Sequence, residues 1–115
     1  MIKKNIFATV PLDQTYCHGG EGTIKFRRIL EKEFNAKISF LDYTILPPGT
    51  SIGFHQHVHN EEVYIILKGK GLMAVDAEET EVGEGDVILT PSQSSHGLKN
   101  HTAHNLEILV FEGRF

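Results

Sequence analysis

The amino-acid sequence predicts an all-β protein of the sandwich or barrel type. Short apolar runs rich in β-branched and aromatic residues recur along the chain, Gly and Pro residues separate them, and no long helical pattern lies between them. Runs of this length bounded by turn residues are typical of strands. The runs expected to form strands are Ile38–Leu46, Ile52–His57, Glu62–Lys68, Leu72–Asp76, Thr80–Val82, Asp86–Thr90 and Leu106–Phe111.

Residues 23–34, ahead of these runs, fit two periodicities. The apolar side chains from Phe26 to Phe34 recur at the helical spacing i, i+3, i+4 and i+8, whereas those from Ile24 to Leu30 alternate as on a strand, with Arg28 as the polar exception. Because the rest of the chain is all-β, we expect a strand over residues 23–30. A short helix in this stretch is the alternative.

Two of the expected strands, Glu62–Lys68 and Leu106–Phe111, carry apolar residues on both faces. A strand with one face in water should alternate apolar and polar residues, so both faces of these two strands should be covered. A single barrel has one interior, and the second cover is expected to be another copy of the chain. The sequence therefore predicts a homodimer.

Composition places the chain among ordinary globular proteins. It has 115 residues, of which 40% are hydrophobic and 23% charged, and this size suits one domain over residues 1–115. The single cysteine, Cys17, excludes an internal disulfide and fits a cytoplasmic location.

Charge and hydropathy exclude two classes of partner. The net charge is −4, and the only basic cluster, Lys25, Arg27 and Arg28, is interpreted as a solvated face, so no nucleic-acid partner is expected. No apolar stretch approaches the ~20 residues of a membrane span, and the apolar run near the N-terminus is too short for a signal peptide.

The seven histidines carry the chemical signal. His55 and His57 are two residues apart, which places both imidazoles on one face of a strand. Glu62 follows a four-residue turn and opens the next strand, which is expected to pair with the first. Two imidazoles and one carboxylate suit ferrous iron or manganese.

A third imidazole belongs to a separate stretch of the chain. His96 begins a new strand after the turn at Pro91, and it supplies a fourth ligand if this strand lies across the barrel from the first. His59 falls in a turn and is expected to face solvent, with a role as substitute ligand as the alternative. The remaining histidines lie in polar surroundings and are expected at the surface: His18, His101 and His104.

These two stretches resemble the two sequence signatures of the cupin superfamily. The first signature is matched at every position by Gly49, His55, His57, Glu62 and Gly69, within residues 49–69. The second, within residues 85–100, is matched by Gly85, Pro91, His96 and Asn100. The one departure is Gln93, where the family has Gly, and it affects the expected turn type rather than a ligand.

The resemblance is to small single-domain bacterial cupins. It implies a jelly-roll β-barrel of two antiparallel sheets, usually dimeric, with one divalent transition metal per chain. The implied metal ligands are His55, His57, Glu62 and His96. Manganese or iron is favoured, and nickel, zinc, cobalt and copper also occur in the family.

The resemblance leaves the reaction open, because cupins include enzymes, storage proteins and sensors. The first hypothesis is a metalloenzyme of the dioxygenase, oxidase or decarboxylase type acting on a small anionic or oxygenated substrate. The alternatives are a non-catalytic small-molecule or sugar sensor, a sugar-phosphate isomerase-like activity, and a purely structural barrel. Candidate catalytic bases are Tyr64, on the same strand face as Glu62, and Asp42 or Tyr43. The Gly-rich stretch 18–22 is expected to be a flexible turn that borders the pocket.

Overall fold

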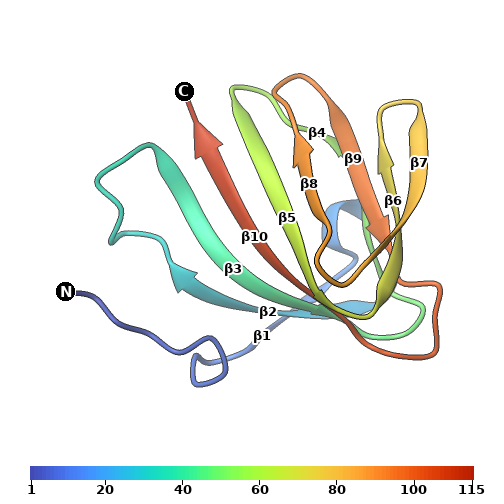
Figure 1. The fold of residues 1–115 in the computed structure, drawn as a ribbon, viewed down its shortest axis with the longest axis horizontal. Helices are drawn as coiled ribbons and strands as arrows, with labels where there is room; N and C mark the ends of the chain where they lie inside the picture. The colour runs from blue at the N-terminus through green and yellow to red at the C-terminus, as the bar shows by residue number, and fades with distance from the viewer.

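Two antiparallel sheets face each other in the computed structural model, which describes all 115 residues (Figure 1). The larger sheet has six strands, in the spatial order β1 (Leu12–Thr15), β2 (Thr23–Leu30), β3 (Ile38–Leu46), β10 (Leu106–Arg114), β5 (Asn60–Lys68) and β8 (Val87–Thr90). The smaller sheet has four, in the order β4 (Ser51–Gln56), β9 (Ser95–Lys99), β6 (Lys70–Val75) and β7 (Glu78–Gly83). The predicted all-β jelly roll is confirmed.

The observed strands follow the apolar runs closely. Strand β3 has the expected bounds, and β2 covers the expected residues 23–30. Residues 31–34 form a turn and a loop, so the alternative of a helix there is wrong. Strand β1 was not expected, because all four of its residues are exposed and it has no apolar alternation. The only helical element is the 3-10 turn η1 (Cys17–Gly19).

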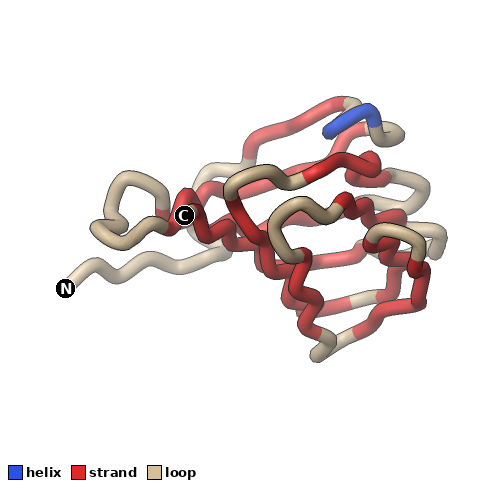
Figure 2. The backbone as a smooth tube through the Cα atoms, turned by 90° about the horizontal axis from the view of Figure 1, so that it is seen from above, coloured by secondary structure: helices blue, strands red, loops and turns tan.

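The core lies between the two sheets, where inward-facing residues of both meet. Alternation along β5, β9 and β10 places every second side chain in this layer. Its most buried aliphatic members are at most 1% exposed: Leu46, Ile66, Met73, Leu98, Leu106 and Ile108. Figure 2 shows the sheets from above, with the N-terminal segment extending beyond one side of the sandwich.

The N-terminal segment covers part of the outer face of the larger sheet. The ring of Phe7 meets Tyr43 edge-on, with ring centroids 5.7 Å apart, and Tyr43 is only 2% exposed. Arg27 holds this segment in place by donating hydrogen bonds to the carbonyl oxygens of Phe7 and Thr9. Arg28, the next residue, points to the opposite face, so the interpretation of the basic cluster as one solvated face is wrong.

The other part of the same outer face, over β8, β5 and β10, has no such cover. Cross-strand pairing forms two apolar rows there, Leu89–Val63–Phe111 and Val87–Ile65–Leu109. In β8, Val87 is 65% exposed and Leu89 is 53% exposed. The outward apolar face predicted from the sequence is therefore present.

No helix in the structure has the length and apolar composition that a bilayer crossing requires.

Candidate metal centre

The three histidines of the candidate centre lie on or directly beside the smaller sheet, and the glutamate lies on the larger one. His55 on β4 and His96 on β9 are direct cross-strand partners, and His57 follows immediately after β4. Glu62 lies on β5, in the larger sheet. The expectation that the strands of His55 and Glu62 pair is therefore wrong, because the β4–β5 turn crosses from one sheet to the other. His96 lies beside His55 rather than across the barrel from it.

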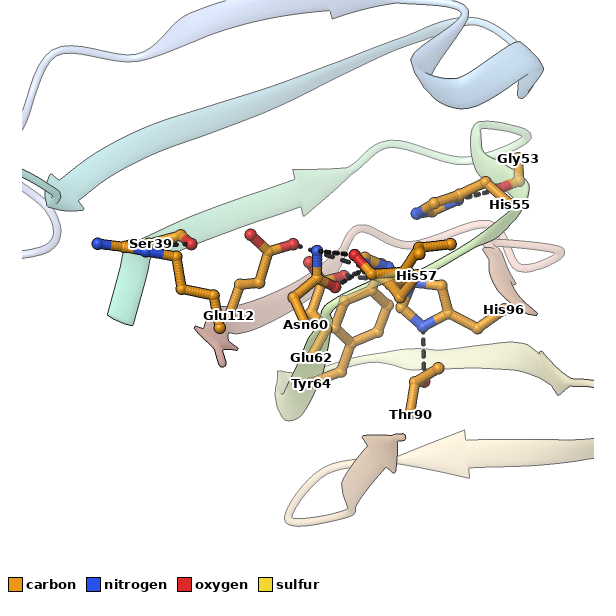
Figure 3. Close-up of polar contacts among 12 residues, drawn as sticks. Ser39, Gly53, His55, His57, Asn60, Glu62, Tyr64, Thr90, His96 and Glu112 are labelled. Carbon is orange, nitrogen blue, oxygen red and sulfur yellow. Dashed lines mark hydrogen bonds and ion pairs between the residues drawn. The ribbon is translucent and has the colours of Figure 1, made fainter. Parts of the chain in front are cut away.

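The four side chains nevertheless converge on one point (Figure 3). One nitrogen or carboxylate oxygen from each of His55, His57, Glu62 and His96 lies within 4.8 Å of all the others. The Nε2 atoms of His57 and His96 are 2.9 Å apart, and Glu62 Oε1 lies 3.2 Å from His96 Nε2 and 3.5 Å from His57 Nε2. His96 is 0% exposed and Glu62 is 6% exposed.

The second nitrogen of each imidazole has its own partner outside the cluster. A neutral imidazole that donates from Nδ1 leaves a free lone pair on Nε2, which is the form that binds a metal. Each Nδ1 lies at hydrogen-bond distance from an acceptor: Gly53 O at 2.6 Å for His55, Asn60 Oδ1 at 2.7 Å for His57, and Thr90 Oγ1 at 2.7 Å for His96. Three imidazoles with Nδ1 paired in this way and one carboxylate form a donor set that fits a divalent transition metal.

The charge states of Glu62 and His55 agree with that fit, whereas the hydrogen bond with Glu62 raises the pKa of His57. Burial alone would raise the pKa of Glu62, but its hydrogen bonds with His57 and His96 outweigh burial and lower the pKa to about 2. Burial lowers the pKa of His55 to about 4, and the neighbouring imidazoles act in the same direction. Near neutral pH, Glu62 is therefore an anion and His55 is neutral, as metal ligation requires.

Of the three candidate bases, only Tyr64 reaches the cluster. Its hydroxyl oxygen lies 3.5 Å from His96 Nε2, on the same strand face as Glu62. Burial, and then the charge of Glu62, raise its pKa well above the ordinary tyrosine value, so the phenol keeps its proton. Tyr43 points to the opposite face of the sheet, and the carboxylate of Asp42 is occupied by Arg28.

Glu112 is a further carboxylate that the sequence analysis missed. It stands directly opposite Glu62 in the β10–β5 register, and its Oε1 lies 3.5 Å from His57 Nδ1. Glu112 belongs to no motif, and only strand pairing brings it to the centre. Glu112 therefore offers His57 Nδ1 a second acceptor next to Asn60 Oδ1.

His18 is exposed, as expected, and it also borders the centre. Its ring stacks on His55, with ring centroids 3.6 Å apart and an angle of 11° between the planes. The turn that carries it packs against the backbone of β4 so closely that a Cβ on Gly53 would lie 2.1 Å from His18 O. His18 itself has a left-handed backbone, with φ 49°. The Gly-rich stretch 18–22, expected to border the pocket, was the sequence feature that pointed to this position. His59, His101 and His104 are exposed, as expected.

The turn before His96 keeps a Gly-like backbone although Gly is absent. Gln93 has φ 77°, in the left-handed region that Gly adopts without strain. Two hydrogen bonds hold it: its N–H donates to His57 O at 2.7 Å, and Gln56 Nε2 donates to its carbonyl at 2.8 Å. Gln93 thus adopts a backbone that a Gly at this position would adopt without strain.

A pocket of about 410 Å³ opens beside the cluster. Glu62 and Tyr64 form its inner end, and the floor is the inward face of β10, β3 and β2. The turn carrying Cys17 and His18 lines the opposite wall. A small molecule in this pocket would therefore lie next to Glu62.

Comparisons with known proteins agree with the fold and with the motif. The family model for the cupin domain matches residues 42–112. An oxalate-binding protein from Thermotoga maritima is 35% identical over 93 residues, which cover 80% of this chain and 77% of that protein. An uncharacterised protein from Methanocaldococcus jannaschii is 42% identical over 65 residues, which span 52% of its length.

A solved structure extends the similarity to the whole chain. The crystal structure of a protein described as a predicted oxalate decarboxylase, also from Thermotoga maritima, superposes with a TM-score of 0.96 and 29% identity. The match covers 99% of this chain and 100% of that one.

Proposed function

Since the chain belongs to the cupin family, we propose that its histidine–glutamate cluster holds one divalent metal and that the centre binds a small carboxylate of the oxalate class. The ligands would be His55, His57, Glu62 and His96. The observation that carries the proposal is that each of the three imidazoles pairs its Nδ1 outside the cluster while the potential ligand atoms of all four side chains lie within 4.8 Å of one another.

The donor set favours manganese or iron among the metals that cupins use. A carboxylate oxygen with several imidazole nitrogens suits these ions, and softer thiolate ligands are not among the clustered side chains. When bound, the metal would supply a Lewis acid for carboxylate oxygens.

The surrounding charges favour an anion. Imidazoles bind a metal in the neutral form. A divalent ion held by three of them and one carboxylate would therefore carry one net positive charge, and burial of Glu62 and His96 would keep that charge poorly screened. The oxalate-binding relative from Thermotoga maritima supports oxalate itself as the first ligand to test.

The test is metal analysis followed by titration calorimetry with oxalate. Protein loaded with Mn²⁺ is expected to contain one metal per chain and to bind oxalate saturably. His96→Ala should lower both metal content and oxalate binding, whereas His101→Ala, at an exposed histidine, should change neither. Stoichiometric metal in His96→Ala, or no oxalate binding by loaded wild type, would overturn the proposal.

A second candidate function is decarboxylation of oxalate, and the position of Tyr64 favours it. The reaction converts hydrogen oxalate to formate and CO₂, so a proton must end on the carbon of formate. The Tyr64 phenol is a buried proton donor beside His96. Formate release by the wild type that Tyr64→Phe abolishes, with oxalate binding retained, would support this candidate. Oxalate binding without formate would exclude it.

We also propose that two copies of this domain associate through the outer face of β8, β5 and β10. The two apolar rows described above give this face the character of an interface core, with Val87 and Leu89 as its exposed part. The N-terminal segment, which packs on Tyr43 at the other part of the sheet, leaves this face free.

A further inference from the structure

The pocket beside the metal centre is much larger than oxalate. Its volume is about 410 Å³, whereas oxalate occupies on the order of 100 Å³, the space of a few water molecules. Half of the residues that line the pocket are hydrophobic, 7 of 14. Oxalate, which consists of two carboxylates and nothing else, would leave most of the hydrophobic pocket lining without contact.

The floor of the pocket leads away from the centre along one row of the larger sheet. Starting at Tyr64 on β5, successive cross-strand partners are Val110 on β10, Asp42 on β3 and Arg28 on β2. With neighbouring strands about 4.8 Å apart, Asp42 is roughly 10 Å from Tyr64 along this row. A ligand anchored at the centre therefore needs an arm of several carbon atoms to reach the far end.

Aromatic rings line this path. The guanidinium carbon of Arg28 lies 4.5 Å from the centroid of Phe40 and 5.7 Å from that of Phe26. Both rings are pocket-lining residues and only partly buried, so each offers surface to a ligand. Phe26 on β2 and Phe40 on β3 flank the paired Arg28 and Asp42, and Val110 lies between them and the centre, so apolar surface borders the path as far as its charged end.

The charged end has no free cation for a second carboxylate. Arg28 Nε and Nη2 donate to the two carboxylate oxygens of Asp42 at 2.8 and 2.9 Å, and Nη1 donates to Glu31 at 3.1 Å. Asp13 also lines the pocket. A negative group at this end would face the two carboxylates of Asp13 and Asp42 and one guanidinium that is already paired.

We propose that the pocket binds a 2-oxo or 2-hydroxy monocarboxylate with a neutral, apolar arm of about four to seven carbons, the head at the centre and the arm against Phe26 and Phe40. This inference rests on the proposed function for the anchoring of the head. It adds the identity of the rest of the ligand: apolar in the middle and uncharged at the far end.

A series of ligands on Mn²⁺-loaded wild-type protein tests the proposal by titration calorimetry. Pyruvate gives the head alone, 4-methyl-2-oxopentanoate and phenylpyruvate add apolar arms, and 2-oxoglutarate adds a charged one. Burial of a phenyl arm should strengthen binding about tenfold or more relative to pyruvate. Binding of 2-oxoglutarate should be no tighter than that of pyruvate.

Two variants test whether the tighter binding of phenylpyruvate comes from contact with Phe26. Phe26→Ala should remove most of the advantage of phenylpyruvate over pyruvate, whereas Phe54→Ala, at a 57% exposed ring on β4, should retain it. If Phe26→Ala does not fold, the wild-type series alone decides the question.

Oxalate binding separates the two proposals. If oxalate binds but the apolar arms add nothing, or if 2-oxoglutarate binds more tightly than pyruvate, the inference is wrong and the proposed function stands. If phenylpyruvate binds tightly and oxalate does not, the inference stands and the assignment to oxalate is wrong. If the loaded protein binds none of these acids, both are wrong.

Discussion

His55 and His96 face each other as cross-strand partners on β4 and β9, with ring centroids 4.8 Å apart. One pair in the ladder of the smaller sheet thus supplies two of the candidate metal ligands. Their separation depends on strand pairing, which is among the stiffer features of a β-sandwich. The glutamate approaches from the other sheet, and its contribution can be tested separately.

Replacing Glu62 with Gln should weaken manganese binding more than zinc binding. The amide is neutral, and hard cations depend more on carboxylate oxygen than zinc does at a site with three imidazoles. Competition titrations with each metal on wild type and variant measure the ratio of the two affinities. An equal loss for both metals would contradict the assigned role of Glu62.

Thr90→Val should lower metal affinity about tenfold or more without unfolding the protein. The substitution keeps the side-chain shape but removes the acceptor that holds His96 Nδ1 at 2.7 Å. Loss of such an outer partner typically lowers metal affinity by about 10- to 100-fold. Metal titration followed by thermal unfolding measures both effects. Thr80→Val, at an exposed threonine on β7, is the matched control and should leave affinity unchanged.

The metal-free protein should lose stability as the pH falls from 6.5 to about 4 because of His55. Its pKa is lower in the folded state, so over this range the unfolded chain binds more protons and acid favours unfolding. His57, whose pKa is raised by its hydrogen bond with Glu62, acts in the opposite sense.

Comparison with His55→Asn isolates the contribution of His55 to this pH dependence. The free energy of unfolding, measured by denaturant titration at several pH values, should fall more steeply for wild type than for the variant between pH 6.5 and about 4. Parallel curves would show that His55 is not held neutral in the folded protein.

Leu89→Glu should convert the proposed dimer to a monomer. Leu89 is 53% exposed in the outward apolar row of β8, and a carboxylate there would be buried without a partner at an interface. Sedimentation at micromolar concentration distinguishes the two states. Phe54→Glu, on the smaller sheet, should leave the oligomeric state unchanged, and a monomeric wild type would refute the dimer itself.

Residue spacing predicted which residues meet at the candidate centre, but not how. The intervals around His55, Glu62 and His96 match a known signature, so their convergence was expected before any strand was placed. The pairing of β4 with β9, rather than with β5, was not predicted, because the turn between His57 and Glu62 looks the same whether it joins two paired strands or crosses between sheets.

Side chains outside the motifs were harder to place. His18 has a left-handed backbone in an irregular turn, and no periodicity describes such a segment. Arg28 was grouped with Arg27 by charge, although alternation along a strand sends neighbours to opposite faces. The partner of Arg28, Asp42, is 14 residues away, and strand register alone brings the two together.

Glu62 is the only member of the candidate ligand set on the larger sheet, and this has a mechanical consequence. An ion bound by all four side chains would act as a cross-link between the two halves of the sandwich. Parting the halves would then require breaking the bond to Glu62, so uptake or loss of the ion and loosening of the sandwich would be coupled through that single carboxylate.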